Sequence, residues 1–272
     1  MSKSDQLKSQ DWRSVIRLVG ECRELGDDPH RWRRHCVEQL ARLVGADWGC
    51  CPEMADLRSG APKDLGVTYS GLENGAIESA LRKLQASIEH EPTLYGAMLA
   101  YFERMAQEDG ACLSRQEIIA DRDWYRSTSY QVIHRSLDVD HVVWCFRTLG
   151  DGGGDDSSGL LLYRETGARG YHARDRSILR EANAALAPLV GGPLARFTEP
   201  SPTDLAPRVR RVLGCLLEGD GDKQIAARLG ISVHTVNQYT KLIYQHFGVC
   251  SRAELLARWV RRGWGGRFAW ID

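Results

Sequence analysis

The feature that most constrains this 272-residue chain is a segment near its carboxyl end, in which four short helical patterns are separated by glycines. In the first pattern, apolar residues recur at the positions expected of a helix packed on one face: Val209, Val212, Leu213, Leu216 and Leu217. Gly219 to Gly221 end this pattern, and Gly230 supplies the positive φ that a later turn needs. Short helices spaced this closely predict a small all-α domain from Asp204 to Gly263.

The second and third patterns predict a short helix followed by a longer one. Asp222 is placed to cap the short helix, Lys223 to Leu229, and Ser232 is a good N-cap for a helix that runs to about Phe247. One face of this third helix, residues 232–247, is suited to the domain core because its side chains recur at steps of four, three and four: Val236, Thr240, Ile243 and Phe247.

The opposite face of the third helix carries hydrogen-bonding groups and one cation, with no acid among them: His234, Asn237, Gln238, Lys241 and Gln245. In the major groove of duplex DNA, amides pair with adenine edges, and lysine donates to O6 and N7 of guanine. The plain alternative is a solvated helix face. The preceding short helices favour the DNA-reading interpretation.

The whole segment resembles the LuxR/NarL/FixJ-type DNA-binding domain, which is a four-helix variant of the helix-turn-helix. The residues that carry the resemblance are Leu205, Pro207, Arg208, Val212, Leu213, Lys223, Ile225, Ala226, Leu229, Gly230, Ile231, Ser232, Thr235, Val236, Ile243, Phe247, Gly248, Val249, Ser251, Arg252, Glu254 and Leu255. The resemblance implies a transcription regulator that binds double-stranded DNA as a homodimer, with RNA polymerase as a further partner.

Roles follow from the resemblance position by position. It implies base contacts for Asn237, Gln238 and Lys241. It implies contacts to the DNA backbone for Lys223, Thr235 and Arg252. It also implies that the last helix, 251–260, mediates dimerisation, so Leu255 and Trp259 are candidates for the dimer seam or for core packing.

Two positions depart from the family pattern. Val209 stands where a glutamate usually ties the first helix to the others, so apolar packing replaces an internal polar bracket. Asn237 stands where a lysine is common, which removes one cation from the DNA-facing side. We expect these changes to alter affinity or site preference and to leave the fold intact.

Residues 1–192 mix helical and strand patterns, and the expected fold class of the chain is therefore α+β. Helical periodicity covers 15–22, 32–44, 76–90, 93–107 and 175–189, whereas 46–54, 65–70, 141–148 and 159–164 have strand character. The polar insert at 150–158 is expected to be a hairpin loop. Helices enclosing an antiparallel sheet are typical of a GAF-like or PAS-like sensor domain. Residues 193–203 are interpreted as a linker, and 264–272 as a tail.

One run in this first domain looks like sequences of GAF-like sensors attached to such DNA-binding domains: residues 122–127, Tyr130 and residues 138–141. Trp124, Tyr125 and Tyr130 are candidates to line a pocket for an unidentified small molecule, and ordinary core packing is the alternative. Acyl-homoserine-lactone receptors have a similar layout, although their Asp-Pro and later Trp pattern is not clearly matched. A sigma-factor-like recruitment of polymerase is a further alternative.

The distribution of charge and the composition indicate which partners and which location to expect. The formal net charge is zero, yet residues 203–272 carry +5 and the rest −5, as expected of a small phosphate-binding domain joined to an acidic one. No stretch has the length of apolar sequence that crosses a bilayer and the start has no signal-peptide pattern, so a cytoplasmic location is expected. We expect no membrane partner.

Catalysis, metals and cofactors are not expected. The eight cysteines lack CxxC spacing and most lie in apolar runs, which is typical of reduced, buried thiols, including the vicinal pair Cys50 and Cys51. His141 and Cys145 are among the nearest pairs of base and nucleophile, and on one strand they would lie about 13 Å apart. The expected function is therefore a non-enzymatic DNA-binding regulator.

Overall fold

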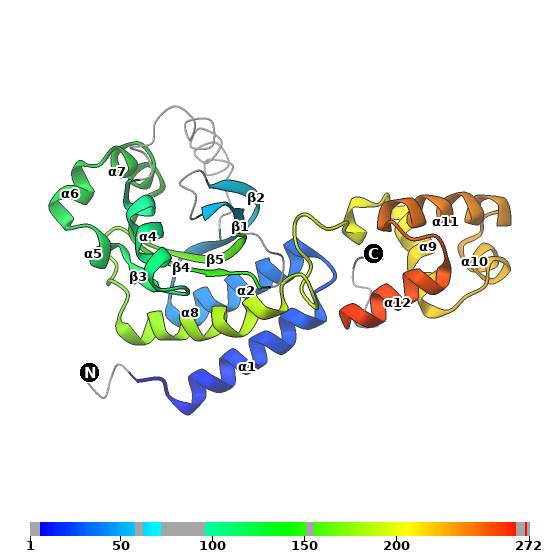
Figure 1. Cartoon of the computed structure of the whole chain (residues 1–272), viewed down its shortest axis with the longest axis horizontal. Coiled ribbons are helices and arrows are strands. Elements are labelled where there is room, and N and C mark those ends of the chain that lie inside the picture. Colours follow the sequence, from blue (N-terminus) through cyan, green and yellow to red (C-terminus); the bar gives the residue numbers. More distant parts are fainter. Residues whose placement is uncertain (1–5, 58–61, 72–95, 151–154, 265–269, 271–272) are drawn as a thin grey trace. The chain divides into compact units, whose positions relative to one another are not determined.

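The computed structural model describes residues 6–57, 62–71, 96–150, 155–264 and 270, which form two compact units (Figure 1). Residues 1–20 and 33–188 make up the first, called here the sheet unit. Residues 21–32 and 189–272 make up the second, called the helical unit. Among the described residues, no helix is both long and apolar enough to cross a membrane.

The sheet unit is built on five antiparallel strands in the order β2-β1-β5-β4-β3. The strands are β1 Trp48–Ala55, β2 Lys63–Ser70, β3 Cys112–Ser114, β4 Val139–Thr148 and β5 Ser157–Glu165. The hairpin of β4 and β5 lies at the centre, as the sequence predicts for 141–148 and 159–164. Ser157 and Ser158 belong to β5 rather than to the predicted loop, because they pair with Arg147 and Thr148 of β4.

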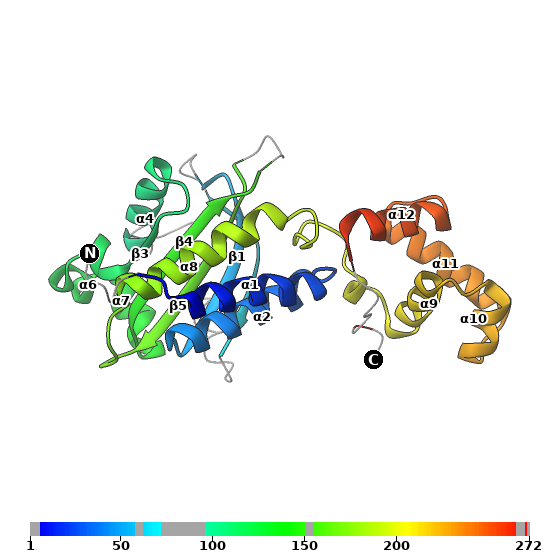
Figure 2. The ribbon, with the colours of Figure 1, turned by 90° about the horizontal axis from the view of Figure 1, so that it is seen from below.

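Helices cover both faces of this sheet (Figure 2). On one side lie α1 Ser9–Glu24, α2 Pro29–Val44 and α8 Ala173–Leu186. On the other lie α4 Gly96–Gln107, α5 Arg115–Ile118, α6 Asp121–Arg126 and α7 Thr128–Val132. The enclosed antiparallel sheet is the predicted architecture. The helix predicted at 76–90 lies outside the described residues.

Successive side chains of β1 point to opposite faces of the sheet and pack against different helices. Trp48 and Cys50 point into the apolar cluster formed with α4 and α6. On the other face, Gly49 permits close packing, because a Cβ there would come within 2.9 Å of the Val37 side chain of α2. Glu53 on the same face forms a fully buried ion pair with Arg33 of α2, at 2.6 Å.

Arg164 of β5 is a buried side chain that connects several segments of this unit by hydrogen bonds. Its guanidinium, 1% exposed, donates to the carbonyl oxygens of Val44 and Gly45 at the end of α2. It also donates to the carbonyls of Arg169 and Gly170, each at 2.9 Å, and to the Asp175 carboxylate at 3.2 Å. A single side chain thus satisfies the end of one helix and the segment leading into another.

The helical unit contains α9 Pro207–Glu218, α10 Asp222–Leu229, α11 Val233–Phe247 and α12 Arg252–Arg262. Residues 189–203 pack in the same unit. The Trp32 indole donates to the carbonyl of Ala195 at 3.0 Å, and the Thr203 hydroxyl donates to Asp28 at 2.6 Å. Arg262 donates to the carbonyl of Gly191 at 2.6 Å and pairs with Glu199. The segment is therefore held by side-chain bonds rather than by backbone pairing alone.

The eight cysteines are free thiols. Seven of them are buried, including Cys50 and Cys51 on opposite faces of β1, and Cys250 is exposed. Predicted burial therefore holds for all but one.

The buried carboxyl of Asp27 makes the stability of the helical unit depend on pH. Burial raises the pKa of this carboxyl from 3.8 to about 6, although Trp270 Nε1 donates to it at 2.5 Å. Because the folded chain binds this proton more tightly than the unfolded chain, the contribution of Asp27 to stability is largest below about pH 4. It falls as the pH rises to about 6, by up to about 3 kcal/mol. Asp27→Asn should abolish this decline, as measured by urea denaturation between pH 4 and 8; an unchanged pH profile would contradict it.

Candidate nucleic-acid interface

Each helix of the carboxy-terminal domain ends at a left-handed glycine. Gly219, Gly230, Gly248 and Gly263 have φ between 60° and 99°, and each amide donates back to carbonyls of the preceding turn. The predicted N-cap Ser232 accepts a hydrogen bond from the amide of Thr235. Asp222 is the first residue of α10 rather than its cap, because Gly221 takes the cap position and its amide donates to the Gln224 side chain. These ends fix where α11 begins and stops.

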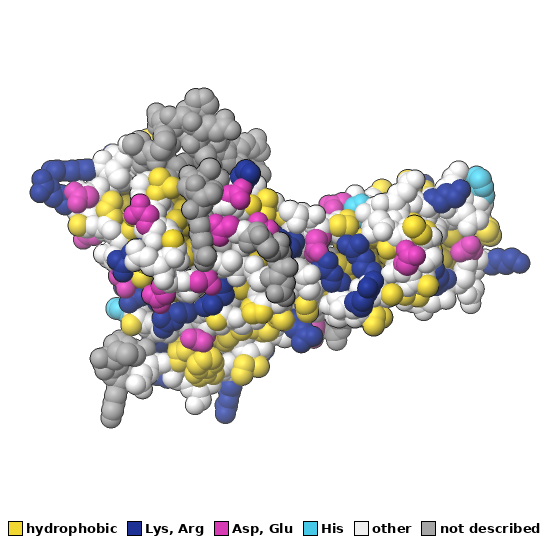
Figure 3. All heavy atoms as spheres, in the orientation of Figure 1, with side chains coloured by type: hydrophobic (Ala, Val, Ile, Leu, Met, Phe, Trp, Pro, Cys, Tyr) yellow, Lys and Arg dark blue, Asp and Glu magenta, His cyan; other side chains and the backbone are white. Residues whose placement is uncertain are grey.

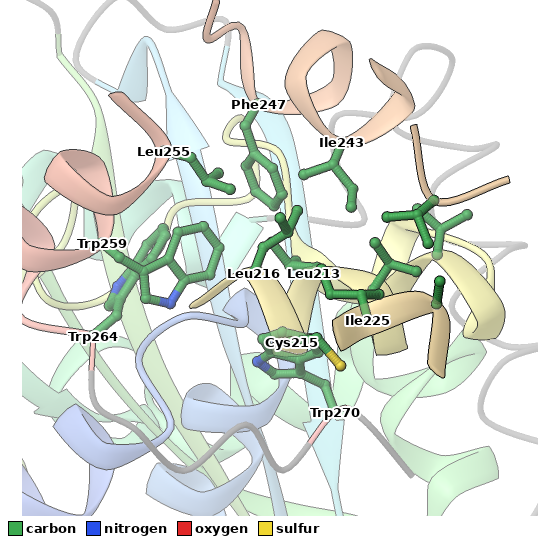
Figure 4. Packing of buried hydrophobic residues seen from close by; sticks show 14 of the residues in the cluster. Leu213, Cys215, Leu216, Ile225, Ile243, Phe247, Leu255, Trp259, Trp264 and Trp270 are labelled. Carbon is green, nitrogen blue, oxygen red and sulfur yellow. The ribbon is translucent and has the colours of Figure 1, made fainter. Parts of the chain in front are cut away.

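The helices converge on a single apolar core (Figure 4). Phe247 of α11 lies beside Leu255 and Trp259 of α12, and its ring meets the Trp259 ring edge to face at 5.2 Å. Val209 is 6% exposed within this core, so apolar packing occupies the position where a glutamate was expected from the family pattern. The core holds α11 with one face inward.

The periodicity predicted for α11 is confirmed. Val236, Ile243 and Phe247 are buried, and Thr240 beside them is partly buried. Asn237, Gln238 and Lys241 are all exposed, on the opposite face. On this face the Gln238 amide contacts the His234 imidazole at 3.1 Å. The sequence of α11 contains no Asp or Glu, so no carboxylate of this helix would repel phosphates.

The predicted DNA-backbone residues differ in their surroundings. Lys223 is exposed at the start of α10. Thr235, in the first turn of α11, shares a 2.9 Å hydroxyl contact with Ser232. Arg252 is partly buried and donates to the carbonyls of Leu216 and Asp220, both at 2.7 Å. Its guanidinium therefore satisfies the carboxyl end of α9.

Leu255 and Trp259 are 0% and 4% exposed and belong to the domain core. Both side chains pack in the core of this chain, and their role at a dimer seam stays a prediction. Val260 on the same helix is 77% exposed. Val260 is thus an exposed apolar side chain next to Trp259 in the sequence.

The hydrogen bonds from arginine side chains to carbonyl groups at helix ends were not predicted from the sequence. Arg258 donates to the carbonyl of Phe247 at 2.7 Å, as Arg252 does for α9, and the two thereby connect α12 to the helix ends around it. Trp264 was assigned to a tail, yet it is 6% exposed, packs on Trp259 and donates to the carbonyl of Pro193 at 3.1 Å. The clustering of Arg and Trp after residue 257 was the available signal.

The pocket candidates of the sheet unit form an aromatic cluster. Trp124 is 0% exposed, and its ring centroid lies 5.6 Å from that of Tyr130 and 4.6 Å from that of His134. Burial lowers the pKa of His134 to about 4, so this imidazole is neutral at pH 7. Tyr125 is 38% exposed and donates to Asp140 at 2.8 Å. In the part of the chain that the structure describes, the Trp124 indole N–H has no hydrogen-bond partner.

A comparison with known protein families finds a match to the carboxy-terminal domain. Residues 203–259 match the family described as bacterial regulatory proteins, luxR family. Response regulator Rre1 of Synechocystis sp. (strain ATCC 27184 / PCC 6803 / Kazusa) is 36% identical over 81 residues, which cover 29% of this chain and 35% of that protein. The chain thus spans about a third of the length of this curated relative.

Solved structures give weaker likenesses. Escherichia coli SdiA is 16% identical, with a TM-score of 0.42 over 93% of this chain and 98% of that one. The VqsR LBD domain from Pseudomonas aeruginosa is 14% identical, with a TM-score of 0.43 over 65% of this chain and 92% of that one. The family match assigns residues 203–259 to the helix-turn-helix domain of the luxR family of bacterial regulatory proteins.

Proposed function

We propose that this chain is a sequence-specific transcription regulator that binds duplex DNA as a homodimer, with α11 in the major groove. The observation that carries the proposal is the exposed face of α11, where two amides and one ammonium group lie together without a carboxylate. A second helix, α10, precedes it across the turn at Gly230, as a helix-turn-helix requires.

On this proposal, Asn237 and Gln238 hydrogen-bond to adenine edges, and Lys241 donates to guanine. Lys223 and the amino end of α11 around Thr235 bind phosphates, because free backbone N–H groups and the helix dipole favour anions there. Arg252 also has a structural role within the domain. Its bonds to Leu216 and Asp220 fix the end of α9. We propose that its remaining N–H groups contact a DNA phosphate.

We assign DNA binding to 204–263 and signal reception to 1–192, with 193–203 joining them and 264–272 following. Such a regulator would act in the cytoplasm, where bacterial DNA is found. In the sheet unit, Trp124, Tyr125 and Tyr130 are proposed to contact a small-molecule signal. The buried indole N–H of Trp124 supports this, since a buried donor without an acceptor costs about 1–3 kcal/mol that a ligand oxygen would recover.

Lys241→Ala tests the base contact. After binding sites are selected from random duplexes, the variant should bind the preferred duplex more weakly by about 1–3 kcal/mol and lose preference at one base-pair position. The measurement is a fluorescence-anisotropy titration against the selected duplex and its single-base variants.

Lys223→Ala is the matched control, because it removes one exposed cation from α10. It should weaken binding about equally on all duplexes and reduce the slope of log affinity against log salt by about 1. Equal loss on every duplex for Lys241→Ala would assign that lysine to phosphate. DNA affinity of the unaltered protein that ignores salt would refute the proposed function.

A further inference from the structure

Two buried cysteines of the sheet unit face each other across neighbouring strands. Cys112 of β3 lies directly opposite Cys145 of β4 in the register of the sheet, and both are free thiols. Directly opposed residues of an antiparallel pair have Cα atoms about 4.5–5.5 Å apart and side chains on the same face. Disulfides join residues whose Cα atoms are about 4.4–6.8 Å apart. The backbone therefore holds these two thiols at a spacing that suits a disulfide.

The backbone beside this pair is bridged by a side chain. The Tyr101 hydroxyl of α4 donates to the carbonyl of Ala111 and accepts from the amide of Phe146, both at 2.7 Å. Strand β3 has only three residues, Cys112–Ser114, and lies at the edge of the sheet. A short edge strand next to a bridged position is locally adjustable, so it can make the small shift that brings two sulfur atoms into bonding distance.

The groups around the pair favour a thiolate at Cys145. A hydrogen bond from the Cys112 thiol lowers the pKa of the Cys145 thiol, although burial opposes the shift, and Asn183 Nδ2 donates to the same sulfur at 3.6 Å. The positive charges of Arg147 and Arg180 act in the same direction. Figure 3 shows Lys and Arg side chains gathered where α8 runs. Since the thiolate is the form that reacts with oxidants, Cys145 is the nucleophile of the pair.

Cys112 has the complementary properties. Burial and its bond to Cys145 raise the pKa of the Cys112 thiol, which therefore keeps its proton. Its side chain is 8% exposed, so the pair reaches the surface on this side. Cys50 and Cys51 differ, because their side chains point to opposite faces of β1 and burial raises the pKa of both thiols. Oxidation should therefore select Cys112 and Cys145 over the vicinal pair.

We propose that Cys112 and Cys145 form a redox site that hydroperoxides convert to a disulfide. The Cys145 thiolate attacks one oxygen of the peroxide and breaks the O–O bond, which forms a sulfenic acid and releases an oxyanion that takes up a proton. The Cys112 thiol then loses its proton, and its sulfur attacks the Cys145 sulfur. An S–S bond forms, the S–O bond breaks, and water leaves. Two thiols are oxidised while one hydroperoxide is reduced to water and an alcohol, or to two waters when it is hydrogen peroxide.

The first test is peptide mapping of the full-length chain after treatment with hydrogen peroxide. Unreacted thiols are blocked with N-ethylmaleimide, and trypsin then releases residues 105–115 and 136–147, each of which contains a single cysteine. A disulfide joins these peptides into one species, lighter than their sum by two hydrogen atoms. We expect this species from the folded chain, and we expect dithiothreitol to remove it. Treatment in urea is the control, because there the eight thiols should pair without selection.

The second test is the melting temperature of the full-length chain, measured by circular dichroism before and after the peroxide. The disulfide closes the loop from 112 to 145, so it should raise the melting temperature of the sheet unit by about 5 °C or more. Cys145→Ser should abolish this rise. Cys51→Ser is the matched control, because Cys51 is also buried on a strand of the same sheet, and this variant should keep the full rise.

The results that would overturn the site are specific. Recovery of the two peptides as separate maleimide adducts from peroxide-treated protein rules out the disulfide, and a link that forms only in urea belongs to the unfolded chain. A melting temperature that rises equally in Cys145→Ser assigns the rise to another residue. If Cys145→Ser does not fold, peptide mapping of the unaltered chain still decides. Because neither test uses DNA, a failure here leaves the DNA-binding proposal standing, and the reverse also holds.

Discussion

Phe247→Ala should strongly destabilise the carboxy-terminal domain and weaken DNA binding with it. The Phe247 side chain, the last of α11, is 1% exposed and packs edge to face on the Trp259 ring. The guanidinium of Arg258 lies 5.9 Å from the centroid of the Phe247 ring. Removing a buried phenyl group leaves a cavity that costs about 3–5 kcal/mol. Since small domains have only about 5–15 kcal/mol of stability, this loss is a large part of the total.

Urea denaturation followed by tryptophan fluorescence measures this effect, because Trp259 and Trp264 lie in the affected core. Leu242→Ala is the control on the same helix. Leu242 is 49% exposed, so its truncation should change stability by less than about 0.5 kcal/mol. If the free energy of unfolding of Phe247→Ala equals that of the unaltered protein, α11 is not held by this core. The proposal that the opposite face of α11 contacts bases would then lose its structural support.

Arg164→Ala should have an equally large effect on the sheet unit. The substitution removes the donor from four carbonyl oxygens and leaves the Asp175 carboxylate, 4% exposed, without this partner. Breaking a buried ion pair by deleting one partner costs about 3–5 kcal/mol. The stacking of the guanidinium on the Tyr171 ring, 4.0 Å from its centroid, is lost as well.

The matched control is Arg169→Ala. The Arg169 side chain is 60% exposed and lies 3.9 Å from the same Asp175 carboxylate, so its loss should change stability by less than about 1 kcal/mol. Arg164→Lys should remain destabilised, because an ammonium group cannot reproduce the planar set of donors. Thermal unfolding monitored by circular dichroism distinguishes these outcomes, and equal melting temperatures for Arg164→Ala and Arg169→Ala would disprove the special role of Arg164.

The carboxy-terminal domain was largely predictable because its signals are local. Helical periodicity placed Val236, Ile243 and Phe247 inside, and a glycine marked the end of each helix. The strands on either side of residues 150–158 were predicted for the same reason, since alternation and a polar turn suffice for a hairpin. In such segments, the residues that decide the structure are neighbours along the chain.

What the sequence did not predict depends on contacts between distant residues. Trp270 bonds to Asp27, 243 positions away, and Arg164 completes a helix that ends 120 positions earlier. Neither residue belongs to a local pattern that names its partner. The same limit applies to Arg252, which was assigned to DNA by position, whereas its bonds to Leu216 and Asp220 depend on how α12 packs against α9.

The uneven exposure of the cysteines has a practical consequence for spectroscopy. Because Cys250 alone among the eight thiols is exposed, a maleimide fluorophore should attach to it selectively without prior mutagenesis. The dye would be attached in the turn between α11 and α12, a few residues from the end of α11, the helix proposed to contact bases. The native chain therefore carries its own attachment point for following operator engagement in real time.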